Sequence, residues 1–151
     1  MKSNQLDEVA ELLTRIPPIM HRKIHRYVFK ATFTQAGEDI SLHHLIILKE
    51  LQIEGPLHLS EIGDIIGISK PQMTHSTDKL FSLGMIERQP DAHDRRKINI
   101  LLTQKGRDTL EKLEKIIRSR IKERLSALSD DELEKLTQSF KYIKEAFSKL
   151  E

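Results

Sequence analysis

The chain has 151 residues, of which 38% are hydrophobic and 32% charged, and it contains no cysteine and no tryptophan. This length suits a single domain with a real core, and the composition is far from that of a disordered segment. The lack of cysteine excludes disulfides, cysteine-ligated metals and thiol-based redox sensing within these residues. The formal net charge is only +2, so the distribution of charge says more about partners than the total does.

Positive charge gathers in residues 21–30, which carry four lysines and arginines and no acid, whereas residues 130–151 carry six acids against four lysines. No apolar run approaches the ~18 residues of a membrane span. The polar residues that follow Met1 leave no core for a signal peptide. We therefore expect a soluble, cytoplasmic protein with no membrane partner.

The first predicted helix covers residues 6–16, where apolar side chains recur along one stripe. Pro17-Pro18 should then end this helix, kink it or begin the next one, since proline is tolerated only in a first turn. A second helix is predicted over about residues 19–33, and a loop over residues 34–39. A third helix starts at Ser41 and ends near Gly55-Pro56, which combines a glycine stop with a proline.

Residues 57–103 have the pattern of two short helices followed by a β-hairpin. The first helix fits residues 59–66 and the second runs from Ser69 until Gly84 ends it. Two strand-like stretches, 85–89 and 98–103, then flank a highly charged turn. This order describes a winged helix-turn-helix, in which the second helix enters the major groove of DNA and the hairpin tip lies beside it.

The second helix offers a polar face of the kind that contacts nucleic acid. Ser69 and Gln72 form an S-x-x-Q capping box that fixes its start, while Met73, Thr77 and Leu80 should face inward. Amide, hydroxyl and amino groups on the other face suit base edges and phosphates. An ordinary solvated helix face is the alternative. The candidate DNA contacts are Ser69, Lys70, Gln72, Thr74, His75, Ser76 and Lys79.

The turn of the hairpin is dense in charge. The acids could hold one arginine by paired hydrogen bonds and leave another free, and a free arginine fits a narrow minor groove. A self-neutralising turn kept for solubility is the alternative. The candidate wing contacts are His93, Arg95, Arg96 and Lys97, and the candidate brace is Asp91 with Asp94.

Two apolar helices are predicted at the C-terminal end. Residues 103–125 repeat leucine and isoleucine at spacings of three and four, and a capping box at Ser129 and Glu132 opens the last helix. Packing against a second copy would cover these helices and the N-terminal one; an intramolecular bundle is the alternative.

The predicted fold class is therefore mainly α with a small β-hairpin wing. N-terminal helices that take part in dimerisation occupy residues 1–40. The winged helix-turn-helix follows in residues 41–104, and C-terminal dimerisation helices occupy residues 105–151.

The run Asp91-Ala-His-Asp-Arg-Arg96, followed by a strand and Leu102-Thr-Gln-Lys-Gly106, resembles the wing signature of the MarR (multiple antibiotic resistance regulator) family. That signature is D-x-R-D-x-R, then a strand, then L-T-x-x-G. The resemblance covers about residues 16–150 and is sharpest in 59–106. It implies a homodimer, built from terminal helices, that binds a pseudo-palindromic operator in double-stranded DNA, most often as a repressor. It also implies a cleft for a small phenolic or lipophilic effector.

Two departures from the family pattern bear on the wing and the N-terminus. His93 stands where the first arginine of the motif is usual; it could make that contact pH-sensitive or be a plain exposed histidine. By position, Asp94 with Arg96 matches the structural pair, which leaves Arg95 for the groove. Pro17-Pro18 precedes the first helix of the family, which suggests an added N-terminal helix.

The histidines raise the question of a ligand. His21 and His25 lie at i and i+4, a spacing that can bind zinc, but the sequence has no cysteine and no histidine after His93. We therefore predict neither metal nor cofactor, and keep a zinc-responsive regulator as an alternative. A cationic face formed by His21, His25, Arg22 and Arg26, beside the ligand cleft or near phosphate, is favoured. Its pairing with a salicylate-like aromatic acid is a second hypothesis. The candidate ligand cleft comprises His21, His25, Arg26, His43 and His44.

An enzyme is not expected, because the sequence has no glycine-rich phosphate loop and no plausible set of nucleophile, base and orienting group. No catalytic residue is therefore predicted. A winged helix that serves as a protein-interaction module is the remaining alternative, although such modules usually lack a basic wing.

Overall fold

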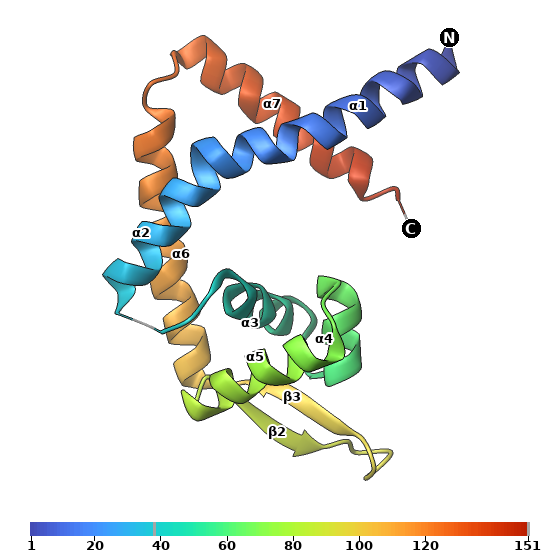
Figure 1. Ribbon diagram of the computed structural model, residues 1–151, viewed down its shortest axis with the longest axis vertical. Helices are drawn as coiled ribbons and strands as arrows, with labels where there is room; N and C mark the ends of the chain where they lie inside the picture. The colour runs from blue at the N-terminus through green and yellow to red at the C-terminus, as the bar shows by residue number, and fades with distance from the viewer. Residues whose placement is uncertain (38, 151) are drawn as a thin grey trace.

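A computed structural model describes residues 1–37 and 39–150. The protein is mostly helical, with one small antiparallel sheet (Figure 1). Its elements in chain order are α1 (Lys2–Met20), the π-helix η1 (His21–His25), α2 (Arg26–Ala36), α3 (Leu42–Glu54), β1 (Leu57–His58), α4 (Leu59–Ile66), α5 (Lys70–Ser82), β2 (Ile86–Pro90), β3 (Ile98–Leu102), α6 (Gln104–Leu125) and α7 (Asp130–Phe147).

The first three elements form one uninterrupted helical rod. The prediction that Pro17-Pro18 ends or begins a helix is wrong, because both prolines lie inside α1. They are exposed to solvent, so water can reach the carbonyl groups that they leave without a donor. A single wide turn, η1, follows, in which the Arg26 N–H bonds back to the carbonyl of His21. The added N-terminal helix is therefore present, and it joins α2 without a loop.

The winged lobe is built from α3, α4, α5 and the sheet. Helix α4 has the predicted bounds, and Gly67 ends it in the left-handed conformation, with a φ of 73°. The strands have the order β1-β3-β2. In the hairpin, Ile86 pairs with Leu102 and Pro90 with Ile98. Strand β1 was not predicted from the sequence; its Leu57 pairs with Ile100 and makes the sheet three-stranded.

The core lies inside this lobe and extends along α6. Fully buried side chains come from α2, α3, α4, α5, the residue just before β2 and the first half of α6. Burial of large aliphatic groups from so many elements is what holds the lobe together, at about 1.5–3 kcal/mol for each. They include Ile47, Leu48, Ile62, Met73, Leu80, Met85, Leu110 and Leu113.

Helix α6 connects the winged lobe to the rest of the molecule. Lys49 of α3 forms an ion pair with Glu114 at 3.0 Å. Helix α2 also packs against α6, and Lys112 Nζ donates to the carbonyl of Ala36 at 2.8 Å. The chain then turns, and Ser129 with Glu132 forms the predicted capping box that opens α7.

Helices α1 and α7 have no buried residue, although each carries an apolar stripe. They lie at the opposite end of the molecule from α5 and the hairpin (Figure 1). No helix within residues 1–37 and 39–150 combines the length and apolar character needed to cross a membrane.

Candidate nucleic-acid interface

The start of α5 is fixed by the capping box that the sequence predicts. The Ser69 hydroxyl accepts from the backbone N–H of Gln72, and the Gln72 carboxamide oxygen accepts in return from the Ser69 N–H at 3.3 Å. This exchange satisfies two of the N–H groups that a helix start leaves unpaired. The side chains of Lys70, Thr74 and His75 follow on the exposed face.

The opposite face of α5 is buried. Met73, Thr77 and Leu80 are inside the core, as predicted. The prediction that Ser76 belongs to the exposed face is wrong, since only 8% of this residue is exposed. Position 76 lies three residues after Met73 and four before Leu80, which places it on the same buried stripe.

Lys79 is half-buried rather than free. Its ammonium group forms an ion pair with Asp39, which lies just before α3. The hydrogen bond and the positive charge of Lys79 hold the pKa of Asp39 below its ordinary value. This pair ties the end of α5 to the segment that enters α3, so Lys79 has a structural partner on its own chain.

Asp91 organises the turn of the wing, and it does so through backbone groups rather than through an arginine. Its carboxylate accepts from the N–H groups of His93 at 2.8 Å and Asp94 at 3.0 Å, and from the Asn99 side chain at 3.3 Å. These bonds favour the ionised carboxylate and lower its pKa. The predicted brace at Asp91 is therefore an aspartate-capped turn.

Asp94 and Arg96 are in contact, as the motif suggests. The Asp94 carboxylate accepts from the backbone N–H of Arg96 at 3.0 Å and from its Nε at 3.4 Å. Arg95 forms no hydrogen bond or ion pair within the described part of the chain, and its side chain is exposed, as are those of His93 and Lys97. The tip thus presents a guanidinium group with its donors unused.

A basic hollow of about 410 Å³ joins α5 to the wing. Lys70 comes from the first turn of α5, and Arg96 and Lys97 come from the wing. Ser60 of α4 and the N-terminal end of that helix complete the wall. Cationic side chains next to a hydroxyl and free backbone donors form a suitable receptor for a phosphate group.

Four residues that were not predicted from the sequence support this interface, namely Arg88, Asp78, Phe81 and His58. Arg88 of β2 pairs with Asp78 of α5 at 3.2 Å, and its guanidinium lies 4.3 Å from the centre of the Phe81 ring. The Nδ1–H of His58 donates to the Ile98 carbonyl at 3.3 Å. The sequence pattern of strand β2 did not indicate a role for Arg88, because its partner Asp78 is brought to it by the packing of α5 on the sheet.

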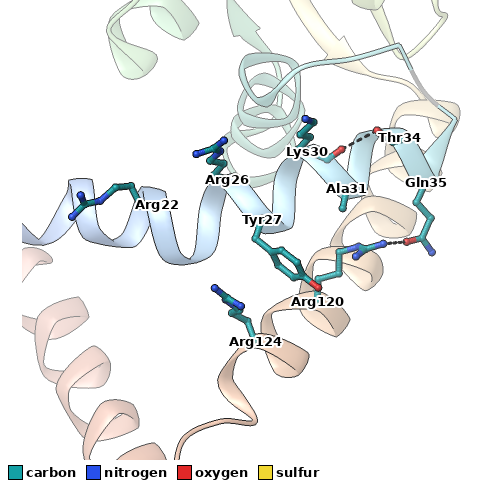
Figure 2. Close-up of a pocket in the computed structure, with 9 residues that line it drawn as sticks. All are labelled: Arg22, Arg26, Tyr27, Lys30, Ala31, Thr34, Gln35, Arg120 and Arg124. Carbon is teal, nitrogen blue, oxygen red and sulfur yellow. Dashed lines mark hydrogen bonds between the residues drawn. The ribbon is translucent and has the colours of Figure 1, made fainter.

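The five candidate ligand residues do not line one hollow in this chain. His25 lines an apolar hollow of about 550 Å³ between the N-terminal rod and α6–α7, where its ring lies 5.5 Å from that of Phe29. His21 has its ring 6.4 Å from that of His25 and does not line the hollow. Arg26 lines a different, cationic groove (Figure 2).

His43 and His44 lie elsewhere, in a shallow hollow at the start of α3 next to His75 of α5. They are separated from His21 and His25 because α2 packs on α6 whereas the start of α3 faces α5. Within the described residues, no three histidine, aspartate or glutamate side chains are placed to hold a metal ion together.

Three helices, a three-stranded sheet and a protruding basic hairpin in this order define a winged helix-turn-helix protein. The chain belongs to the MarR family of transcriptional regulators. A MarR family model matches residues 38–97. The chain is 34% identical over 119 residues to the uncharacterized HTH-type transcriptional regulator YkoM of Bacillus subtilis. The aligned residues make up 76% of this chain and 77% of that protein.

Solved structures share the fold across nearly the whole chain. Apo MarR from Escherichia coli is 20% identical with a TM-score of 0.76, covering 87% of this chain and 96% of that chain. A MarR family protein from Bacillus stearothermophilus is 19% identical with a TM-score of 0.72, covering 99% of both chains. The relatives are transcription regulators and not enzymes, and the same class applies to this chain.

Proposed function

We propose that this protein is a homodimeric repressor that binds a pseudo-palindromic operator and releases it in response to a small effector. Helix α5 would enter the major groove, and the wing would reach the adjacent minor groove. The observation that carries this proposal is the joint placement of the exposed face of α5 and the basic hairpin at one end of the molecule (Figure 1), with Lys70, Arg96 and Lys97 around one hollow.

A structural neighbour supports the mode of binding. A mutant of E. coli MarR complexed with operator DNA is 21% identical, with a TM-score of 0.65, and covers 91% of this chain and 96% of that chain. A shared fold allows the same docking, in which two copies place their recognition helices about one helical turn of DNA apart. The protein-interaction alternative has no observation in its favour, because the wing keeps its cationic side chains.

The operator would be obtained by selecting bound duplexes from a random pool, and affinity would then be measured by fluorescence anisotropy over a series of salt concentrations. We expect the logarithm of the binding constant to fall steeply with the logarithm of salt concentration, because several phosphates per dimer release counterions. A flat salt dependence, or no binding in low salt, would contradict DNA recognition and favour the interaction module.

Arg95→Ala should weaken operator binding by about 1–3 kcal/mol, the range of a specific arginine contact. Arg118→Ala serves as the control, because it removes an equal charge from an exposed position on α6. Arg96→Ala should act in part through the turn, since Arg96 is bonded to Asp94. If Arg96→Ala lost more affinity than Arg95→Ala while remaining folded, the assignment of the two arginines would be reversed.

The effector that we propose is a small aromatic acid, such as salicylate, in the apolar hollow beside His25. Ten side chains line this hollow, and the imidazole of His25 is the only titratable group among them. An aromatic ring would gain burial there, and the imidazole could donate a hydrogen bond to the carboxylate.

Salicylate should lower the operator affinity of the parent protein, and His25→Gln should blunt this effect. His21→Gln is the matched control, since His21 is a neighbouring histidine that does not line the hollow. If salicylate lowered the operator affinity of both variants equally, the hollow would not be the effector site. Zinc responsiveness is not proposed, because no observation favours it.

A further inference from the structure

A groove of about 790 Å³ between α2 and α6 is lined by more positive charge than any part of the proposed DNA interface (Figure 2). Its volume is in the usual range of small-molecule sites, about 300–1,000 Å³. Three cationic side chains come from η1 and α2, and two come from α6. The residues that matter are Arg22, Arg26, Lys30, Arg120 and Arg124, with the Tyr27 ring between the two walls.

The cations of this groove have no carboxylate partner in the described part of the chain, although Glu123 of α6 lies at its edge and accepts from the Tyr27 hydroxyl at 3.5 Å. No aspartate or glutamate lines the groove in the described part of the sequence. None of its five cations forms an ion pair with a carboxylate there. In Figure 2, Arg26 and Lys30 leave α2 on the side away from Arg120 and Arg124, so an anion that contacted several of these cations would have to extend across the groove. Such contacts would be favourable, because no carboxylate is paired with these cations in the described residues.

The two arginines of α6 are positioned by neutral partners. An amino group of Arg120 donates to the Gln35 side chain at 2.6 Å (Figure 2), while its buried Nε has no partner within the described residues. Arg124 Nε donates to the Lys23 carbonyl at 3.0 Å, and its guanidinium lies 5.2 Å from the centre of the Tyr27 ring. Each guanidinium has five N–H donors, so most of them remain available to a ligand.

The length of the groove indicates what kind of anion fits. Arg22, Arg26 and Lys30 succeed each other at four-residue intervals and form a row about 12 Å long. Arg120 and Arg124 form a second row about 6 Å long on the other wall. A single carboxylate could contact only one end of such an array, whereas a linear ligand with several charges could contact both rows.

We propose that this groove binds a small linear polyanion, and that oligophosphates are the class that fits it best. Guanidinium groups form paired hydrogen bonds with phosphate oxygens. An oligophosphate also carries enough charge to match five cations. The groove shares no lining residue with the apolar hollow at His25, and helix α2, which forms one of its walls, lies apart from α5 and the wing (Figure 1). The inference therefore does not depend on operator binding or on the aromatic effector.

Isothermal titration calorimetry of the full-length protein with tripolyphosphate tests this inference, at fixed ionic strength and without DNA. We expect one binding site per chain. The double variant Arg26→Gln/Lys30→Gln should bind at least about tenfold more weakly, the factor for losing one charge-assisted contact. The matched control is Arg118→Gln/Lys122→Gln, which removes the same charge from exposed positions on α6 outside the groove and should change the affinity by less than about twofold.

Orthophosphate, citrate and salicylate form the comparison set for the ligand. Each should bind more weakly than tripolyphosphate, because each presents less charge or a shorter array. The inference is overturned if the control variant loses as much affinity as the groove variant, which would indicate diffuse attraction. It is equally overturned if citrate or salicylate binds as tightly as tripolyphosphate, or if the parent shows no binding. Arg22→Gln gives a second groove variant, and far-UV circular dichroism verifies that each protein is folded.

Discussion

The imidazole of His44 has one nitrogen with a partner and one without. Its Nδ1 accepts from the Ser41 N–H at 2.8 Å and so helps to start α3. Its Nε2 is buried and has no partner within residues 1–37 and 39–150. Burial is the main reason that the pKa of His44 lies below the ordinary 6.5, and the positive charges of Lys79, His43 and His75 lower the pKa further.

This lowered pKa makes the stability of the fold depend on pH. Above 6.5 His44 is neutral in both the folded and the unfolded chain. As the pH falls below that value, the unfolded chain takes up the proton first, so the free energy of unfolding decreases until the folded pKa is passed. Urea denaturation at a series of pH values should show this loss between pH 6.5 and the lower folded value.

His44→Gln should flatten that pH dependence, since glutamine does not titrate. His43→Gln is the control, because its side chain is exposed at the adjacent position and it should keep most of the parent's dependence. If His44→Gln retained the full slope below pH 6.5, another group would be responsible for it.

At the residue scale, the sequence predicted features that depend on near neighbours in the chain. The Ser69–Gln72 capping box was predicted because it joins residues three positions apart, and the Asp94–Arg96 contact was predicted from the resemblance to the family's wing motif. The engagement of Lys79 with Asp39 joins residues 40 positions apart. No spacing rule within α5 contains that information.

Among the secondary-structure elements, the wing and the start of α6 are in close backbone contact. Thr103 caps α6 by accepting from the Gly106 N–H at 3.1 Å and also donates to the Gly84 carbonyl at 2.7 Å. A Cβ atom at Gly106 would lie 2.1 Å from the Met85 carbonyl oxygen and 2.7 Å from a methyl group of Leu102. The L-T-x-x-G sequence therefore has a steric reason: α6 starts in contact with the backbone of the sheet.

Gly106→Ala should accordingly destabilise the protein by about 1–3 kcal/mol or more, since backbone must move to admit the methyl group. Gly63→Ala, inside α4, is the matched control. There the added Cβ meets Ile68 and Met73 at 3.8 Å, an ordinary contact, so this change should be neutral or stabilise by up to about 1 kcal/mol. Thermal or urea unfolding of both variants measures the difference, and equal effects of both changes would refute the steric argument.

The bounds of most helices followed from caps and glycine stops, which are local signals. Strand β1 was missed for the opposite reason. It contains only Leu57 and His58, and it is a strand only because Ile100 and Asn99 lie beside it. The continuation of α1 through Pro17-Pro18 was also not predicted, because proline in a sequence usually indicates the end of a helix. In the structure both prolines are exposed, so water can satisfy the carbonyl groups that lose their donor and the helix continues.

At the scale of the whole molecule, α1 and α7 leave a large apolar surface uncovered. Neither helix buries a residue within the chain. On α7, Phe140, Ile143 and Phe147 lie on one stripe and are 42–48% exposed. Continuous apolar stripes on long helices are typical of an interface between subunits. This feature supports the proposal that the protein functions as a homodimer.

Phe140→Glu should dissociate the dimer. Each contact occurs twice in a twofold dimer, so the substitution should make the free energy of association less favourable by about 3 kcal/mol or more. This corresponds to at least about a hundredfold increase in the dissociation constant. Tyr142→Glu is the control, because Tyr142 is on α7 but off the stripe, with 71% of its surface exposed. Sedimentation equilibrium measures both. If Tyr142→Glu dissociated the protein and Phe140→Glu did not, the interface would be on another face of α7.

The wide turn at His21–His25 sets the rotational phase between two helices that otherwise form one rod. One residue of an α-helix corresponds to about 100° of rotation, and a π turn holds about one residue more than an α turn. Removing a residue such as Lys23 would therefore rotate every side chain of α1 by roughly a quarter of a revolution, while Val28 and Thr32 kept their places in the interior. The direction in which the N-terminal apolar stripe points, and hence the angle at which two copies could meet, is thus decided by the five residues of η1.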